Sequence, residues 1–126
     1  MELHHITLTA DRDSRLPLFA DQAVYHQALH RLGGVCQGRL VLFAVLAEHV
    51  HLVSRQSRPE AGRLAQTVLL GLRPIVATPF APSHIRAVES RAHMRSLLRY
   101  LLEQPLHHGM PGHPALWVGS CLPELD

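Results

Sequence analysis

The sequence contains no lysine, only two cysteines and no long apolar run, and each of these absences narrows what the protein can be. All 12 cationic side chains are arginines, whose planar guanidinium can hold two oxygens of a phosphate at once. Cys36 and Cys121 lie far apart without a CxxC spacing, which argues against a disulfide framework and favours a reducing cytoplasm. No apolar run reaches the ~18 residues of a membrane span, and we expect no secretory signal at the start.

The composition is that of a globular chain. Its 126 residues predict one domain, residues 1–126, that buries its own core, and 47% apolar content excludes a disordered chain. A net charge of +2 is weak evidence for a nucleic-acid partner, although a mixed surface can still carry a basic groove. With 11 histidines, about one His-x-His triplet is expected by chance. A histidine pair therefore carries little weight by itself.

Hydrophobic periodicity predicts seven elements in the order β-α-β-β-α-β-α. The strands are expected at residues 3–10, 39–46, 49–54 and 84–88, and the helices at 19–32, 59–77 and 90–104. Gly33 and Gly34 should stop the first helix, and Pro74 could kink the second helix or end it. Ser90 should cap the last helix, and Pro105 should end it. The Gly- and Pro-rich tail from about residue 106 is expected to be irregular.

Without the last helix, this order is the βαββαβ pattern of the ferredoxin-like α+β fold. The pattern predicts one antiparallel sheet with helices on one face, and an additional C-terminal helix that carries Tyr100. The third strand, 49–54, is central in such a sheet. The fold hosts many functions, so the function must be argued from particular residues.

His49 and His51 alternate on the third strand, so both side chains should project from the same face. Two imidazoles at this spacing can share a metal ion, and imidazole suits Mn or Zn better than Mg. The alternative is an ordinary pair of surface or half-buried histidines, and the spacing alone favours that alternative.

Tyr100 and Gln104 lie four residues apart on the last helix and share one face. The amide oxygen of Gln104 can bind a hard cation, but an amphipathic helix with a polar edge explains the pair equally well. If the helix lies across the sheet, a tyrosine hydroxyl would meet a His-His-Gln metal site. Such a site could polarise a phosphate while the phenol attacks phosphorus.

Three segments resemble a known family. Residues 40–53, LVLFAVLAEHVHLV, are similar to the histidine–hydrophobe–histidine segment of single-strand DNA transposases with one catalytic tyrosine. Residues 99–109, RYLLEQPLHHG, resemble the tyrosine motif of one branch, the REP-associated tyrosine transposases, and residues 5–20 resemble its opening strand and loop. The similarity runs in order along nearly the whole chain.

The resemblance implies a function and a set of site residues. His49, His51 and Gln104 match the metal ligands, and Tyr100 matches the nucleophile that forms a 5′-phosphotyrosine. The implied cofactor is Mg or Mn, and the implied partners are single-stranded or hairpin DNA and a second copy of the chain. Candidate DNA contacts are Arg91, Arg95, Arg99, His107 and His108, although the arginine stripe could be a solvated helix face.

Two other functions stay open. The chain could be a domesticated or degenerate derivative that binds structured DNA without cutting it. It could also be a ferredoxin-like protein of unrelated function, in which case Tyr100 should lie far from both His49 and His51.

Overall fold

The computed structural model describes most of the chain up to the last helix. The described residues are 2–11, 18–19, 21–35, 40–46 and 49–107. The elements are β1 (Leu3–Thr9), α1 (Gln22–Val35), β2 (Leu40–Val45), β3 (His49–Ser54), α2 (Arg58–Leu72), β4 (His84–Val88) and α3 (Arg91–His107). Within these ranges no helix is both long enough and apolar enough to span a membrane.

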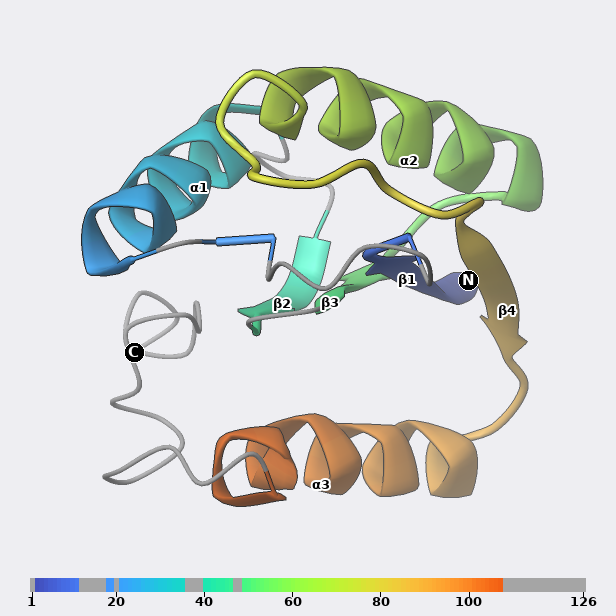
Figure 1. Cartoon of the computed structure of the whole chain (residues 1–126). Helices are drawn as coiled ribbons and strands as arrows, with labels where there is room; N and C mark the ends of the chain where they lie inside the picture. The colour runs from blue at the N-terminus through green and yellow to red at the C-terminus, as the bar shows by residue number, and fades with distance from the viewer. Residues whose placement is uncertain (1, 12–17, 20, 36–39, 47–48, 108–126) are drawn as a thin grey trace.

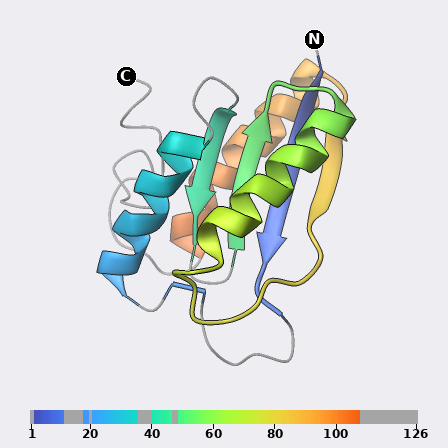
Figure 2. The same cartoon turned by 90° about the horizontal axis from the view of Figure 1, so that it is seen from above.

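The four strands form one antiparallel sheet in the order β2-β3-β1-β4, which is the strand order of the ferredoxin-like fold. Helices α1 and α2 cover one face of this sheet, and α3 lies across the opposite face (Figure 1). Viewed from above, α1 and α2 lie in front of the strands and α3 behind them (Figure 2). The predicted fold class, with helices on one face and an additional C-terminal helix, is confirmed.

The central strands explain why the sheet has two different faces. On β1, Ile6 and Leu8 are fully buried beneath α1 and α2, while Thr7 between them is half-buried on the other face. On β3, Val50 and Leu52 are likewise fully buried. Because alternate residues of a strand point to opposite faces, one face supplies the main core and the other receives the polar alternates.

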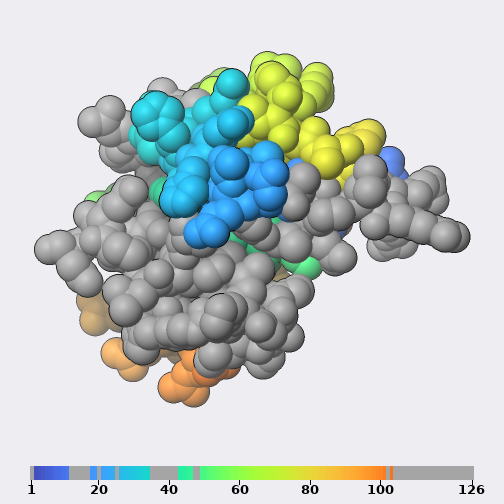
Figure 3. All heavy atoms as spheres, turned by 60° about the vertical axis from the view of Figure 1, so that its left-hand side comes forward, coloured from blue at the N-terminus to red at the C-terminus, as the bar shows by residue number. Residues whose placement is uncertain are grey.

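The two helices over the core are fixed by side-chain contacts and caps. Arg31 of α1 donates a 2.9 Å hydrogen bond to the carbonyl oxygen of Gly71 on α2. Helix α2 starts with a capping box, in which Ser57 and Glu60 bond to each other's backbone N–H groups. Figure 3 shows α1 beside the segment that follows α2 on the surface.

Helix α3 starts where the sequence predicted. The N–H of His93 donates a 3.0 Å hydrogen bond to Oγ of Ser90, so Ser90 is the N-cap. The N–H of Glu89 donates to Nδ1 of His93 in return, at 3.2 Å. Leu97 and Leu101 anchor the helix, since both are buried and belong to the hydrophobic core cluster.

Three helix ends differ from the predicted ranges. Helix α1 continues through Gly33 and Gly34, so these glycines do not stop it. Helix α2 ends at Leu72 with Arg73 as its C-cap, before residue 77, because Pro74 has no N–H with which to continue the helical hydrogen bonds. Helix α3 continues past Pro105 to His107. A proline in the last turn removes a single intrahelical hydrogen bond, which does not outweigh the rest of a long helix.

We predict that Leu101→Ala lowers the free energy of unfolding by about 2–5 kcal/mol, because it opens a cavity under α3. Leu70→Ala is the matched control, since Leu70 is 60% exposed on α2 and its truncation should change stability by only about 0.5 kcal/mol. Urea unfolding of both variants measures the difference. Equal losses in the two variants would show that α3 is not held by this side chain.

Candidate functional site

The site starts from the side chains that β3 presents to α3. In the antiparallel register, His51 pairs with Thr7 of β1 and His49 pairs with Thr9. The two imidazole rings lie on the same face with their centroids 5.8 Å apart. His49 is half-buried and His51 is only 4% exposed. The histidine pair therefore lies in the layer between the sheet and α3, as the alternation predicted.

Tyr100 reaches this layer from the other side. Its ring meets the ring of His51 edge-on, with centroids 6.0 Å apart and planes at 89°. The side chain is nevertheless 49% exposed, because it also borders a hollow on the outside of α3 together with Arg95 and Arg99. Tyr100 is thus in contact with a site histidine and is still open to a substrate from solution.

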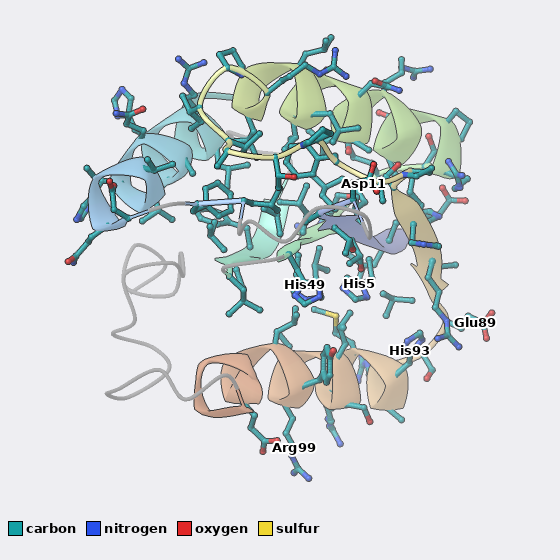
Figure 4. All side chains as sticks on the ribbon, in the orientation of Figure 1. His5, Asp11, His49, Glu89, His93 and Arg99 are labelled. Carbon is teal, nitrogen blue, oxygen red and sulfur yellow. The ribbon has the colours of Figure 1, made fainter. Side chains whose placement is uncertain are left out.

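His5 of β1 is a further member of this cluster and was not among the predicted site residues. Its Nε2 lies 3.1 Å from Nδ1 of His51, and the two rings lie edge to edge with centroids 5.3 Å apart and planes 26° from parallel. Both His5 and His49 point from the sheet towards α3 (Figure 4). The neighbouring His4 points into the opposite face, where its Nδ1 donates to the carbonyl oxygen of Gln56 at 2.9 Å. The buried Ile6 fixes this parity, so the alternation of β1 was the signal that could have identified His5.

The donor chemistry of the pair fits a divalent metal ion. With metal–nitrogen bonds of ~2.1 Å, two imidazoles on one ion have centroids at most about 6.5 Å apart. The 5.8 Å separation of His49 and His51 is within that limit. Among the side chains that the structure describes, no group of three His, Cys, Asp or Glu residues could hold a metal. A further ligand, such as an amide oxygen, would have to complete the site.

The other predicted site residues are distributed along α3. Gln104 lies on this helix one turn after Tyr100, but its side chain and that of His107 are outside the described part, as is the whole of His108. Arg91, Arg95 and Arg99 are exposed. Arg99 points away from the sheet (Figure 4), so it does not face the histidines.

A second hollow adjoins the histidines on the β4 side. It measures about 450 Å³ and is lined by His5, Thr7, His84, Ile85 and Arg86. Arg86 lies opposite His5 in the β1–β4 register, and His84 lies opposite Thr7. The lining includes a guanidinium, two imidazoles and a hydroxyl but no carboxylate, so its chemistry suits an anion. Arg86 was not among the predicted DNA contacts, because its proximity to His5 depends on strand pairing.

The electrostatics of the cluster favour a neutral imidazole at position 5. Burial lowers the pKa of His5 below its ordinary 6.5, and the nearby charges of His93 and Arg86 lower this pKa further. A neutral imidazole keeps a nitrogen lone pair that can accept a hydrogen bond. The imidazole of His5 is therefore available as a hydrogen-bond acceptor within the layer between the sheet and α3.

The comparisons with known proteins bear on the fold. No protein-family model matches the sequence, and no curated protein matches it. Among solved structures, the fold is similar to that of a REP-associated tyrosine transposase bound to a REP hairpin, with a TM-score of 0.75 over 98% of this chain and 78% of that chain. The two sequences are 16% identical, so the similarity establishes a shared fold.

We predict that His5 makes stability depend on pH in a defined direction. Below pH 6.5 the unfolded chain binds a proton at His5 more readily than the folded chain, so the free energy of unfolding should fall as the pH drops. Each unit of pKa depression is worth about 1.4 kcal/mol. The check is urea unfolding of the wild-type protein and His5→Gln between pH 8 and pH 5.

The value at pH 8 gives the cost of the substitution when residue 5 is neutral in both proteins. The wild-type protein should then lose more stability on acidification than His5→Gln does. Parallel pH profiles for the two proteins would contradict a lowered pKa at His5.

Proposed function

We propose that this protein cuts and rejoins single-stranded DNA as a transposase, with Tyr100 as the nucleophile and a Mg or Mn ion held by His49, His51 and Gln104. The observation that carries this proposal is the edge-on contact between Tyr100 and His51, with ring centroids 6.0 Å apart. The shared fold with a REP-associated tyrosine transposase supports it. An unrelated function was expected to keep Tyr100 far from the histidines, and the observed contact disfavours it.

The reaction is a transesterification at phosphorus. Oη of Tyr100 loses its proton and forms a bond to the phosphorus of a phosphodiester, while the bond from phosphorus to the 3′ oxygen breaks and that oxygen takes up a proton. The products are a 5′-phosphotyrosine and a strand that ends in a 3′ hydroxyl, and attack by a 3′ hydroxyl reverses the step and rejoins DNA. A bound metal ion supplies charge neutralisation at the non-bridging phosphate oxygens.

The residues of the chain position this reaction. Leu97 and Leu101 hold α3 in place, which fixes Tyr100 near the histidine pair. The half-exposed phenol can reach a strand that enters from solution. Because the pKa of an unperturbed tyrosine is near ~10, the phenol must be activated, and a neighbouring cation would favour the phenolate. Association of two copies, with hairpin DNA as a further substrate, remains part of this proposal.

Tyr100→Phe should abolish the covalent protein–DNA adduct. The measurement is denaturing electrophoresis of the protein after incubation with 5′- and 3′-labelled single-stranded and hairpin oligonucleotides in Mg or Mn. The control is Tyr25→Phe, which changes the other tyrosine of the chain, on α1 across the sheet. The control should form the adduct at the wild-type level. A wild-type protein that forms no adduct over a broad hairpin library would contradict the proposal.

A second candidate function is DNA binding without cleavage, and the hollow beside β4 favours it. Arg86 and His84 line this hollow next to His5, so they can contact a phosphate whether or not Tyr100 reacts. A domesticated derivative would keep this contact and lose the metal-dependent step. The two functions differ in the adduct assay, whereas both require binding of DNA.

Arg86→Gln should weaken binding of single-stranded DNA and reduce its salt dependence. Loss of one phosphate contact should lower the slope of log affinity against log salt by about 0.7. The matched control is Arg63→Gln, which removes the same charge from an exposed position on α2, across the sheet. Fluorescence anisotropy with a labelled oligonucleotide over a range of salt concentrations measures both. Equal slopes for the two variants would exclude a phosphate contact at Arg86.

A further inference from the structure

We propose that His5 is a positioning residue that fixes the tautomer of His51. In this arrangement the proton of the neutral His51 ring is on Nδ1, and this N–H donates a hydrogen bond to Nε2 of His5. The lone pair of His51 is then on its own Nε2. The role of this hydrogen bond, which is to prepare His51 as a metal ligand, rests on the proposed function. It concerns a contact that can be tested without metal or DNA.

The geometry restricts the proton to two positions. Nε2 of His5 and Nδ1 of His51 are 3.1 Å apart, a hydrogen-bond distance, so one of these nitrogens carries the proton and the other accepts it. If the proton is on His51 Nδ1, the neutral ring has its lone pair on Nε2. If the proton is on His5 Nε2, the neutral ring of His51 must carry its own proton on Nε2, and that nitrogen cannot bind a metal.

The surroundings of His5 are compatible with the first position, and the usual behaviour of metal-binding histidines favours it. Oγ1 of Thr7 lies 3.4 Å from the same Nε2 of His5, and a hydroxyl can either donate to this nitrogen or accept from it, so this contact fits both positions. His51 is only 4% exposed, so solvent has little access to take over this hydrogen bond. The two ring planes differ by only 26° and the centroids are 5.3 Å apart, so the rings lie edge to edge and the hydrogen bond restrains the plane of the His51 ring.

The arrangement follows a general rule for metal sites. A histidine that binds a metal through one nitrogen donates the N–H of the other to an acceptor, which fixes both tautomer and ring orientation. The acceptor is commonly a carboxylate or a backbone carbonyl, and His4 of this chain donates to such a carbonyl at Gln56. For His51 the structure provides an imidazole of the adjacent strand instead.

Two substitutions separate this role from simple packing. Phe at position 5 keeps an aromatic ring against His51 but has no acceptor. Gln keeps an acceptor in its amide oxygen but loses the ring. If His5 acts through the hydrogen bond, Gln should preserve the tautomer of His51 and Phe should not. If His5 acts only through packing of its ring against His51, Phe should be the better replacement.

The first measurement is the tautomer of His51 in the metal-free protein, from two-dimensional NMR that correlates the ring nitrogens with the ring protons. We expect the proton on Nδ1 in the wild-type protein and in His5→Gln, and a loss of this preference in His5→Phe. Observation of the Nε2–H tautomer in the wild-type protein would overturn the proposal. The NMR spectrum of the wild-type protein alone tests the proposal, so the test does not depend on whether the variants fold.

The second measurement is the affinity for Mn²⁺, followed by electron paramagnetic resonance in the absence of DNA. His5→Phe should bind Mn²⁺ about 10–100-fold more weakly, which is the usual cost of removing such a partner. His5→Gln and the control His30→Gln should stay close to the wild-type affinity, since His30 is an exposed histidine on α1, across the sheet from the histidine cluster. Unchanged affinity in His5→Phe would overturn the proposal.

Failure of the proposed function would give a different result. A wild-type protein that binds no Mn²⁺ and forms no adduct would contradict the transposase chemistry. The NMR measurement would still decide whether His5 sets the tautomer of His51. Conversely, an active protein whose His51 carries its proton on Nε2 would retain the function and exclude this role for His5.

Discussion

The site depends on the two-residue alternation of a central strand. Val50 and Leu52 of β3 are fully buried under α1 and α2, and this burial forces His49 and His51 onto the other face. A shift of one residue in the register would exchange the two sets, placing imidazoles in the core and aliphatic side chains in the site. The hydrophobic core therefore determines which face of the sheet the two histidines occupy. Interactions among the site residues are not needed to set this face.

The same alternation divides the molecule into two halves with different tasks. The layer beneath α1 and α2 contains most of the aliphatic core, whereas the layer beneath α3 combines a few leucines with His5, His49 and His51. Helix α3 contributes Tyr100 to that second layer and covers it on the side opposite to the sheet (Figure 1). The histidine cluster and most of the aliphatic core thus lie on opposite faces of one sheet, and Leu97 and Leu101 of α3 add to the core from the side of the histidines.

Much of the fold followed from the sequence, because strand alternation and helical periodicity are local patterns. The ranges of β3 and β4 and the Ser90 cap were predicted as observed, whereas Gly33, Gly34 and Pro105 did not end their helices. The sequence nominated His49, His51 and Tyr100, and the structure brings His51 and Tyr100 into contact. The alternation of β1 was sufficient to place His5 on the same face, whereas the proximity of Arg86 depends on the pairing of β1 with β4, which no local pattern specifies.

The central claim is that one cation binds between the strand histidines and the tyrosine of α3. Paramagnetic broadening of NMR signals by Mn²⁺ tests it directly, because the effect decreases steeply with distance from the ion. The account predicts that substoichiometric Mn²⁺ first broadens the ring signals of His49, His51 and Tyr100, while those of His26 and His30 on α1 stay sharp. Broadening that begins at α1, or that spreads evenly over all histidines, would contradict a shared metal site.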